Sequence, residues 1–165
     1  MSSSDEITVI KVLMVCLGNI CRSPTAHGVF QQRINSHNLQ NRIMVDSAGT
    51  GDWHIGQSPD HRAASAAKAR GYPLDDLRAR QVQAADFHEY DYILAMDHEN
   101  LSELKASCPE DCQHKLALFL SYSDREEEVV PDPYYSGDDG FELVLDMVEE
   151  ASDNLLNELV RRHLN

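Results

Sequence analysis

Several reactive side chains are gathered in one short segment, Cys16-Leu17-Gly18-Asn19-Ile20-Cys21-Arg22-Ser23. A thiolate is a strong nucleophile, and the planar guanidinium of an arginine can bind two oxygens of a tetrahedral oxyanion. A serine hydroxyl directly after the arginine can donate a hydrogen bond to the sulfur. These residue types at this spacing predict covalent chemistry on a phosphate-like anion, with Cys16 as the nucleophile and Arg22 as the clamp.

The residues on either side of this segment predict the elements that position it. Residues 9–15 are apolar apart from Lys11 and indicate a buried strand, whereas Ser23-Pro24 is typical of an N-cap and first helical residue. A loop that enters a helix N-terminus can turn successive N–H groups inward and bind an anion. Gly18 permits such a curl, and Asn19 tolerates a left-handed backbone and can tie the loop together. The inward N–H groups, the positive end of the helix and Arg22 each favour the thiolate form of Cys16.

A thiolate that attacks phosphorus needs an acid to protonate the leaving oxygen. Asp132 is the strongest candidate, because the prolines of Pro131-Asp132-Pro133-Tyr134-Tyr135 restrict the loop and the tyrosines could wall a slot. The same segment is also typical of an ordinary surface turn. Asp46, at the end of a predicted strand, is a weaker candidate acid. Trp53 is either a second aromatic wall or a half-buried anchor.

Apolar runs alternate with segments of helical periodicity along the whole chain. Further strands are expected at 43–46, 92–96 and 115–119, and helices after Pro24 and at 58–70, 98–107 and 141–163. Such alternation predicts an α/β fold, a doubly wound four-stranded parallel sheet of order 2-1-3-4 with helices on both faces. The phosphate loop joins strand 1 to helix 1. Residues 1–165 are expected to form a single domain, with 1–6 as a flexible extension.

The charge balance excludes several classes of partner. The 165 residues include 14 Lys and Arg against 28 Asp and Glu, a net charge of −14. A chain this acidic repels nucleic acid and anionic membranes. The phosphate group of a partner must therefore be held by locally arranged charges. The N-terminal segment lacks the features of a signal peptide or membrane span, and the four cysteines are expected to stay reduced. A cytoplasmic location follows. The loop also lacks the lysine and second glycine of a nucleotide-binding loop.

Five segments together resemble the low-molecular-weight protein tyrosine phosphatases. Residues 15–24 are similar to the signature loop of that family, and the likeness covers nearly the whole chain, from about Val12 to the final helix. The other similar segments follow in family order: Asp46-Ser47-Ala48-Gly49-Thr50, Ala79-Arg80-Gln81, residues 91–97 and Asp132-Pro133-Tyr134-Tyr135.

The resemblance implies a reaction and a role for each matching residue. Cys16 would form a phosphocysteine intermediate, Arg22 would bind the phosphate, and Asp132 would act as general acid and then as base. The backbone amides of the loop would bind the phosphate: Leu17, Gly18, Asn19, Ile20, Cys21 and Arg22. Ser23, Asn19 and Ser47 would support the loop. Trp53, Tyr134 and Tyr135 would form the walls of the substrate slot. No cofactor or metal is implied. The expected partner is a tyrosine-phosphorylated protein, an opposing tyrosine kinase is a candidate, and a monomer is expected.

Several alternatives stay open. Cys21 would either trap an oxidised Cys16 as a reversible disulfide or simply pack under the loop. A thiol-linked arsenate reductase shares the fold but needs a relay cysteine where this chain has Met96-Asp97, and protein-arginine phosphatases typically carry threonine at the position of Ile20. Non-enzymatic alternatives are a phosphotyrosine-binding module and a zinc-stabilised module that uses Cys108, Cys112 and His114. The other histidines, including His27, His54, His61 and His98, receive no role.

Overall fold

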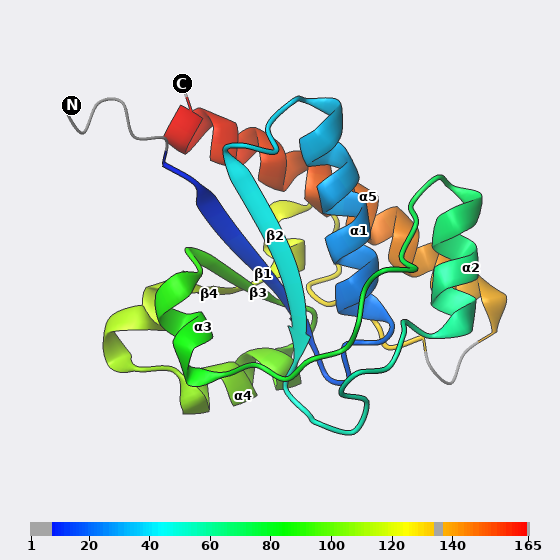
Figure 1. Ribbon diagram of the computed structural model, residues 1–165, viewed down its shortest axis with the longest axis horizontal. Coiled ribbons are helices and arrows are strands. Elements are labelled where there is room, and N and C mark those ends of the chain that lie inside the picture. Colours follow the sequence, from blue (N-terminus) through cyan, green and yellow to red (C-terminus); the bar gives the residue numbers. More distant parts are fainter. Residues whose placement is uncertain (1–7, 134–136, 165) are drawn as a thin grey trace.

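Four parallel strands form the centre of the molecule in the order β2-β1-β3-β4 (Figure 1). They are β1 (Ile10–Cys16), β2 (Ile43–Gly49), β3 (Tyr92–Ala95) and β4 (Leu116–Leu118). The computed structural model describes residues 8–133 and 137–164, so the expected extension at residues 1–6 lies outside the described residues. The strand order and the parallel pairing confirm the predicted doubly wound sheet.

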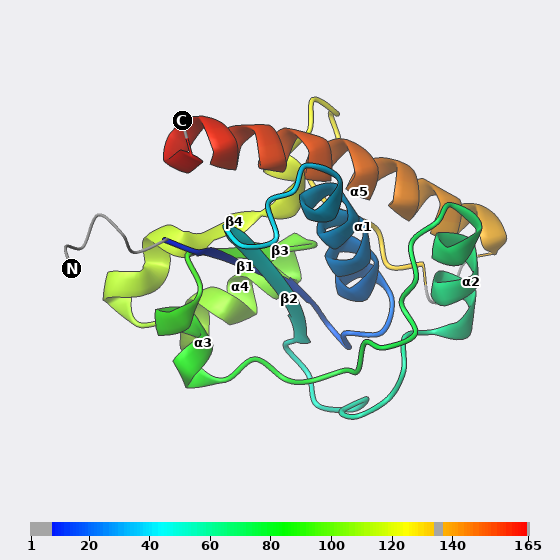
Figure 2. The ribbon, with the colours of Figure 1, turned by 45° about the horizontal axis from the view of Figure 1, so that its top comes forward.

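Helices cover both faces of the sheet (Figure 2). Helices α1 and α5 lie together on one face, and α3 and α4 lie on the other. The helices are α1 (Arg22–Ser36), α2 (His61–Ala69), α3 (Ala84–Glu89), α4 (His98–Ser107) and α5 (Asp138–Leu159), with the short helices η2 (Glu110–Lys115), η3 (Phe119–Tyr122) and η4 (Val160–Leu164). Helix α3 has six residues, too few for a helical period to stand out in the sequence.

The alternation of side chains along β1 decides which way the nucleophile faces. Val12, Met14 and Cys16 pack in the core beneath α1 and α5, whereas Leu13 and Val15 pack in the second core beneath α3 and α4. Successive residues of a strand point to opposite faces, so a strand covered on both sides reads as one apolar run. The side chain of Cys16 therefore points to the α1 side of the sheet, where the chain turns into that helix.

Two helix starts differ from their predicted positions. Helix α1 begins at Arg22 with Cys21 as its N-cap residue, so the expectation that Ser23 is the N-cap was wrong. The Ser23 hydroxyl bonds to groups of the loop instead of capping the helix. Helix α2 begins after Asp60, whose carboxylate accepts hydrogen bonds from the N–H groups of Arg62 and Ala63. Ser58-Pro59 lies before that cap.

Helix α5 combines a buried apolar face with an acidic outer face. Its inner face consists of buried apolar residues: Phe141, Leu145, Val148, Leu155, Leu156 and Leu159. On the outer face, Arg70, the residue directly after α2, binds three α5 carboxylates, Glu142, Asp146 and Glu149. Part of the negative charge of α5 therefore serves to hold the end of α2 against it. Over residues 8–133 and 137–164, no helix has both the length and the apolarity to cross a membrane.

Candidate active site

The loop between β1 and α1 is held from outside through its carbonyl oxygens. Thr50 N–H donates to Cys16 O at 2.9 Å, Gly51 N–H donates to Leu17 O at 2.9 Å, and Asp60 N–H donates to Ile20 O at 2.7 Å. Asn19 has φ 59°, in the left-handed region that asparagine tolerates. Its N–H turns inward and lies 3.3 Å from Cys16 Sγ. The loop thus curls around the sulfur while its carbonyl oxygens are bonded to the segments behind it.

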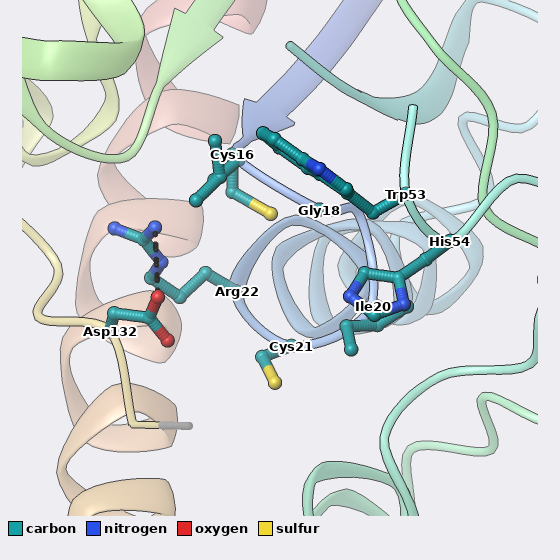
Figure 3. A pocket seen from close by; sticks show the side chains of 9 residues that line it. Cys16, Gly18, Ile20, Cys21, Arg22, Trp53, His54 and Asp132 are labelled. Carbon is teal, nitrogen blue, oxygen red and sulfur yellow. Dashed lines mark ion pairs between the residues drawn. The ribbon is translucent and has the colours of Figure 1, made fainter. Parts of the chain in front are cut away.

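This loop forms one side of a cavity of about 200 Å³ (Figure 3). Three parts of the chain contribute to its walls: the loop itself, the segment that follows β2, and the segment that precedes residue 133. The lining residues are Cys16, Leu17, Gly18, Ile20, Cys21, Arg22, Trp53, His54 and Asp132. Figure 3 shows Asp132 and Arg22 on one side of this cavity and His54 on the opposite side. The predicted nucleophile, clamp and acid therefore share one cavity.

The sulfur of Cys16 has a second hydrogen-bonding neighbour besides Asn19 N–H. Its Sγ lies 3.1 Å from Ser23 Oγ. Asn19 Nδ2 donates to the same Ser23 oxygen at 2.8 Å, so the Ser23 hydrogen is left for the sulfur or for Ala48 O, 3.4 Å away. A thiolate at Cys16 would accept from Ser23 and from Asn19 N–H together. Cys16 and Ser23 are both buried, which limits the competition of water for these bonds.

The guanidinium of Arg22 is held on two sides. Its Nη1 donates to Asp97 Oδ2 at 2.6 Å and to Val130 O at 3.0 Å, and its Nη2 lies 3.7 Å from Asp132 Oδ2. Burial opposes the charge, but Cys16, Asp97 and Asp132 outweigh it and raise the pKa of Arg22 above its ordinary value. Arg22 is therefore a permanent cation in a fixed orientation, as the binding of a phosphate requires.

The candidate acid and one of the expected slot walls, Trp53, lie at the mouth of the cavity. The Asp132 side chain is 42 % exposed and reaches the cavity from beside Arg22. Trp53 is 67 % exposed, and its ring lies against Gly51. Tyr134 and Tyr135, the other expected walls, lie outside the described residues.

Besides Ser23, three of the expected site residues do not line the cavity: Asn19, Ser47 and Asp46. Asn19 is buried behind the loop and faces Ser23 and the backbone of Arg80. Ser47 Oγ lies 3.0 Å from His27 Nδ1, so its bond reaches helix α1 and not the loop. Asp46, the weaker candidate acid, accepts from Arg80 Nε at 3.1 Å and from Tyr90 Oη at 3.3 Å.

Cys21 lines the cavity as a protonated thiol. Burial raises its pKa, and the negative groups of Asp60, Cys16 and Asp132 raise it further, against the smaller opposing effect of Arg62. The two loop cysteines therefore differ in their surroundings. Cys16 has hydrogen-bond donors for its sulfur, whereas the charged groups that act on Cys21 include the carboxylates of Asp60 and Asp132.

Two residues of this site had no role in the sequence analysis. Asp97 follows β3 and binds Arg22, and its position at the carboxyl end of a strand is the signal that could have identified it. His54 lines the cavity, and its ring lies so close to Gly18 that a Cβ there would be 2.8 Å from His54 Cδ2. Its Nδ1 lies 2.9 Å from Gln57 Oε1. No local pattern distinguishes His54 from the exposed histidines.

The proposed zinc ligands have other neighbours. Cys112 Sγ lies 3.6 Å from His88 Nδ1, and Cys108 Sγ donates to Pro109 O at 3.4 Å. Within the part of the chain that the structure describes, no three His, Cys, Asp or Glu side chains are grouped so that they could hold a metal ion. All four cysteines are free thiols.

Comparison with known proteins agrees with this geometry. Residues 11–164 match the family model for low molecular weight phosphotyrosine protein phosphatase. The human protein of that name is 43% identical over 135 residues, which cover 81% of this chain and 85% of the human one. The crystal structure of a protein tyrosine phosphatase from Entamoeba histolytica is 42% identical, with a TM-score of 0.90, and the match covers 92% of this chain and 97% of that one. The crystal structure of the Drosophila arginine phosphatase is 36% identical with a TM-score of 0.84, over 90% and 97% of the two chains. With a signature loop, a sheet order and nearly a full length in common, this chain belongs to the low molecular weight phosphotyrosine protein phosphatase family.

Proposed function

We propose that the protein hydrolyses phosphotyrosine in proteins through a phosphocysteine intermediate, without a metal ion. The observation that carries this proposal is the arrangement of Cys16, Arg22 and Asp132 around one cavity. Family membership supports the same reaction.

In the first step, Cys16 Sγ attacks phosphorus and a sulfur–phosphorus bond forms. The bond from phosphorus to the tyrosine oxygen breaks, and Asp132 gives its proton to that oxygen. Arg22 and the loop N–H groups bind the remaining phosphate oxygens, where negative charge is spread in the transition state. Tyrosine then leaves and Asp132 is a carboxylate.

In the second step, water replaces the sulfur. Asp132 takes a proton from the water while the water oxygen attacks phosphorus, and the sulfur–phosphorus bond breaks. Inorganic phosphate leaves and Cys16 returns as a thiolate, which Ser23 and Asn19 N–H stabilise. Asp132 ends the cycle protonated and ready for the next substrate.

The walls of the cavity favour an aryl phosphate. Trp53 offers an aromatic face beside the phosphate site, and Ile20 contributes an apolar side chain at the position where arginine phosphatases typically carry threonine. An arsenate reductase is disfavoured by the residues after β3. Met96 and Asp97 stand where a relay cysteine would be needed, and Asp97 is engaged with Arg22.

The test measures phosphate release, in excess chelator, from matched phosphotyrosine, phosphoserine and phosphoarginine peptides. We expect turnover that favours phosphotyrosine and is lost in Cys16→Ser. The matched control is Cys108→Ser, which changes another buried cysteine outside the cavity and should keep full activity. Preference for phosphoarginine would overturn the substrate assignment. Failure to hydrolyse any peptide would overturn the phosphatase assignment and direct the search to arsenate reduction or phosphotyrosine binding.

We also propose that Cys21 protects Cys16 from irreversible oxidation. Peroxide would oxidise the Cys16 thiolate to sulfenic acid, and the Cys21 thiol would condense with it to a disulfide and release water. The position of both thiols on one cavity supports this step. Activity lost in peroxide should return with dithiothreitol in the wild type but not in Cys21→Ser. Equal recovery in both proteins would contradict the proposal.

The proposal extends to the partners and the location of the protein. A tyrosine-phosphorylated protein is the substrate, with its tyrosine kinase as a candidate partner, and the enzyme acts as a monomer. The four free thiols support a cytoplasmic location, because thiols stay reduced there.

A further inference from the structure

Arg80 lies behind the catalytic loop, and its side chain is fixed by two carboxylates. Its Nη1 and Nη2 donate to the two oxygens of Asp86 at 2.9 and 3.2 Å, and its Nε donates to Asp46 Oδ2 at 3.1 Å. Burial opposes the charge, but Asp86 and Asp46 outweigh it and raise the pKa of Arg80. Two parallel bonds to one carboxylate restrict the plane of the guanidinium. Arg80 is thus held between β2 and α3.

The backbone of the same residue is bonded to the loop and to the end of β2. Arg80 N–H donates to Asn19 Oδ1 at 2.9 Å, and Arg80 O accepts from Gly49 N–H at 2.8 Å. Two residues further, Val82 N–H donates to Gly49 O at 2.9 Å. The ion pairs of the Arg80 side chain therefore fix the position of a backbone donor to the loop.

That donor determines how the Asn19 amide is turned. Because Oδ1 accepts from Arg80, Nδ2 must point the other way, and it donates to Ser23 Oγ at 2.8 Å. The Ser23 oxygen then acts as an acceptor for Asn19, so its own hydrogen is free to bond to Cys16 Sγ at 3.1 Å. A continuous series of bonds runs from Arg80 through Asn19 and Ser23 to the nucleophile.

We propose that Arg80 is a positioning residue for the nucleophile. It does not line the cavity, and it acts on Cys16 only through Asn19 and Ser23. Its ion pairs with Asp86 and Asp46 keep its N–H at the distance that orients the Asn19 amide. The effect on turnover rests on the proposed phosphatase function, whereas the effect on the sulfur does not.

Arg80→Gln tests this inference, with Arg80→Lys as the conservative variant. Arg70→Gln is the matched control, because Arg70 also binds several carboxylates but does so between α2 and α5. Alkylation of Cys16 by iodoacetamide is followed against pH by mass spectrometry of the Cys16 peptide. Hydrolysis of 4-nitrophenyl phosphate gives kcat and KM, and thermal unfolding shows whether each variant is folded.

We expect a fall in kcat of about tenfold in Arg80→Gln with little change in KM, since losing one oriented hydrogen bond is worth roughly that factor. The pH of half-maximal alkylation should rise in the same variant, because the thiolate loses the Ser23 donor. Arg80→Lys should restore most of both properties. Arg70→Gln should keep the wild-type kcat and alkylation profile even though its melting temperature falls.

Two results would overturn the inference. One is a folded Arg80→Gln with the wild-type alkylation profile and kcat, and the other is an equal loss in Arg70→Gln. Arg80→Gln leaves the buried carboxylate of Asp86 without its cation, which could prevent folding. In that case the double variant Arg80→Gln/Asp86→Asn, which removes both charges, is measured in the same way. The two proposals can fail separately. If the wild type hydrolyses no phosphate ester but the alkylation profile of Arg80→Gln is shifted, the proposed function is refuted and the positioning role of Arg80 is supported.

Discussion

Asp97 divides its two carboxylate oxygens between Arg22 and the first turn of α4. Its Oδ2 accepts from Arg22 Nη1 at 2.6 Å, and its Oδ1 accepts from Asn100 N–H at 2.7 Å. One side chain therefore caps a helix and fixes the phosphate clamp. The first turn of α4 therefore restrains the position of the Arg22 guanidinium through Asp97.

This division allows the two roles of Asp97 to be separated in one variant. Asparagine is as good an N-cap as aspartate, but its Nδ2 would face the Arg22 donor. We predict that Asp97→Asn keeps a melting temperature near that of the wild type and lowers kcat/KM for 4-nitrophenyl phosphate by at least about tenfold. A folded variant with unchanged kcat/KM would show that Val130 O and Asp132 are enough to orient Arg22.

Removal of the Ser23 hydroxyl should slow turnover without weakening substrate binding. We predict that Ser23→Ala lowers kcat by about tenfold, because the thiolate loses one of its two donors. Ser152→Ala is the control, since Ser152 is equally buried, lies in α5 and has no hydrogen-bond partner for its hydroxyl among the described residues. Steady-state kinetics of both variants check the prediction, and an equal loss in the two would contradict it.

Two glycines near the loop should differ sharply in their tolerance of a methyl group. A Cβ on Gly49 would lie 2.7 Å from Leu17 O and 3.2 Å from Asn19 N, both backbone atoms of the loop. A Cβ on Gly18 would meet Cδ2 of the His54 side chain, which can turn away. We predict that Gly49→Ala loses about 1–3 kcal/mol of stability through overpacking, together with most of its activity.

Gly18→Ala serves as the comparison for that prediction. It should unfold at nearly the wild-type denaturant concentration and keep more activity than Gly49→Ala. Urea unfolding and initial rates of both variants decide the matter, and the reverse order would refute the argument from the backbone contacts.

His27 should make the fold less stable in mild acid. Its burial lowers its pKa, as does Arg80, against the opposing effect of Asp46. Below the ordinary value of about 6.5, the unfolded chain takes up a proton that the folded chain does not. Stability is therefore full above that pH and falls as the pH drops toward the folded pKa.

We predict that His27→Gln loses less stability than the wild type between about pH 7.5 and 5.5. Glutamine can still bond to Ser47 but does not titrate. Urea unfolding at the two pH values measures the difference, with His98→Gln as a control at an exposed histidine. An identical pH dependence in His27→Gln and the wild type would show that other groups cause the loss.

The loop that holds the candidate nucleophile and the order of the sheet could both be predicted from the amino-acid sequence. Cys16, Arg22 and Ser23 lie within eight consecutive residues, so the strand before them and the helix after them are enough to predict their meeting. The apolar runs of a parallel sheet buried on both faces are likewise local patterns. The start of α1 was misplaced because Ser23 looks like a cap in sequence, yet its hydroxyl bonds to the loop.

The groups that surround that loop come from distant parts of the chain and could not be predicted in this way. Asp97 and Val130 lie 75 and 108 positions from Arg22, and Arg80 lies 61 positions from Asn19. His54 is drawn to the cavity by its packing against Gly18. Such contacts depend on which strands are neighbours and how far each loop reaches, and no local pattern encodes either. Local sterics and burial determine the conformation of the loop, and the packing of the whole chain determines which charged groups contact it.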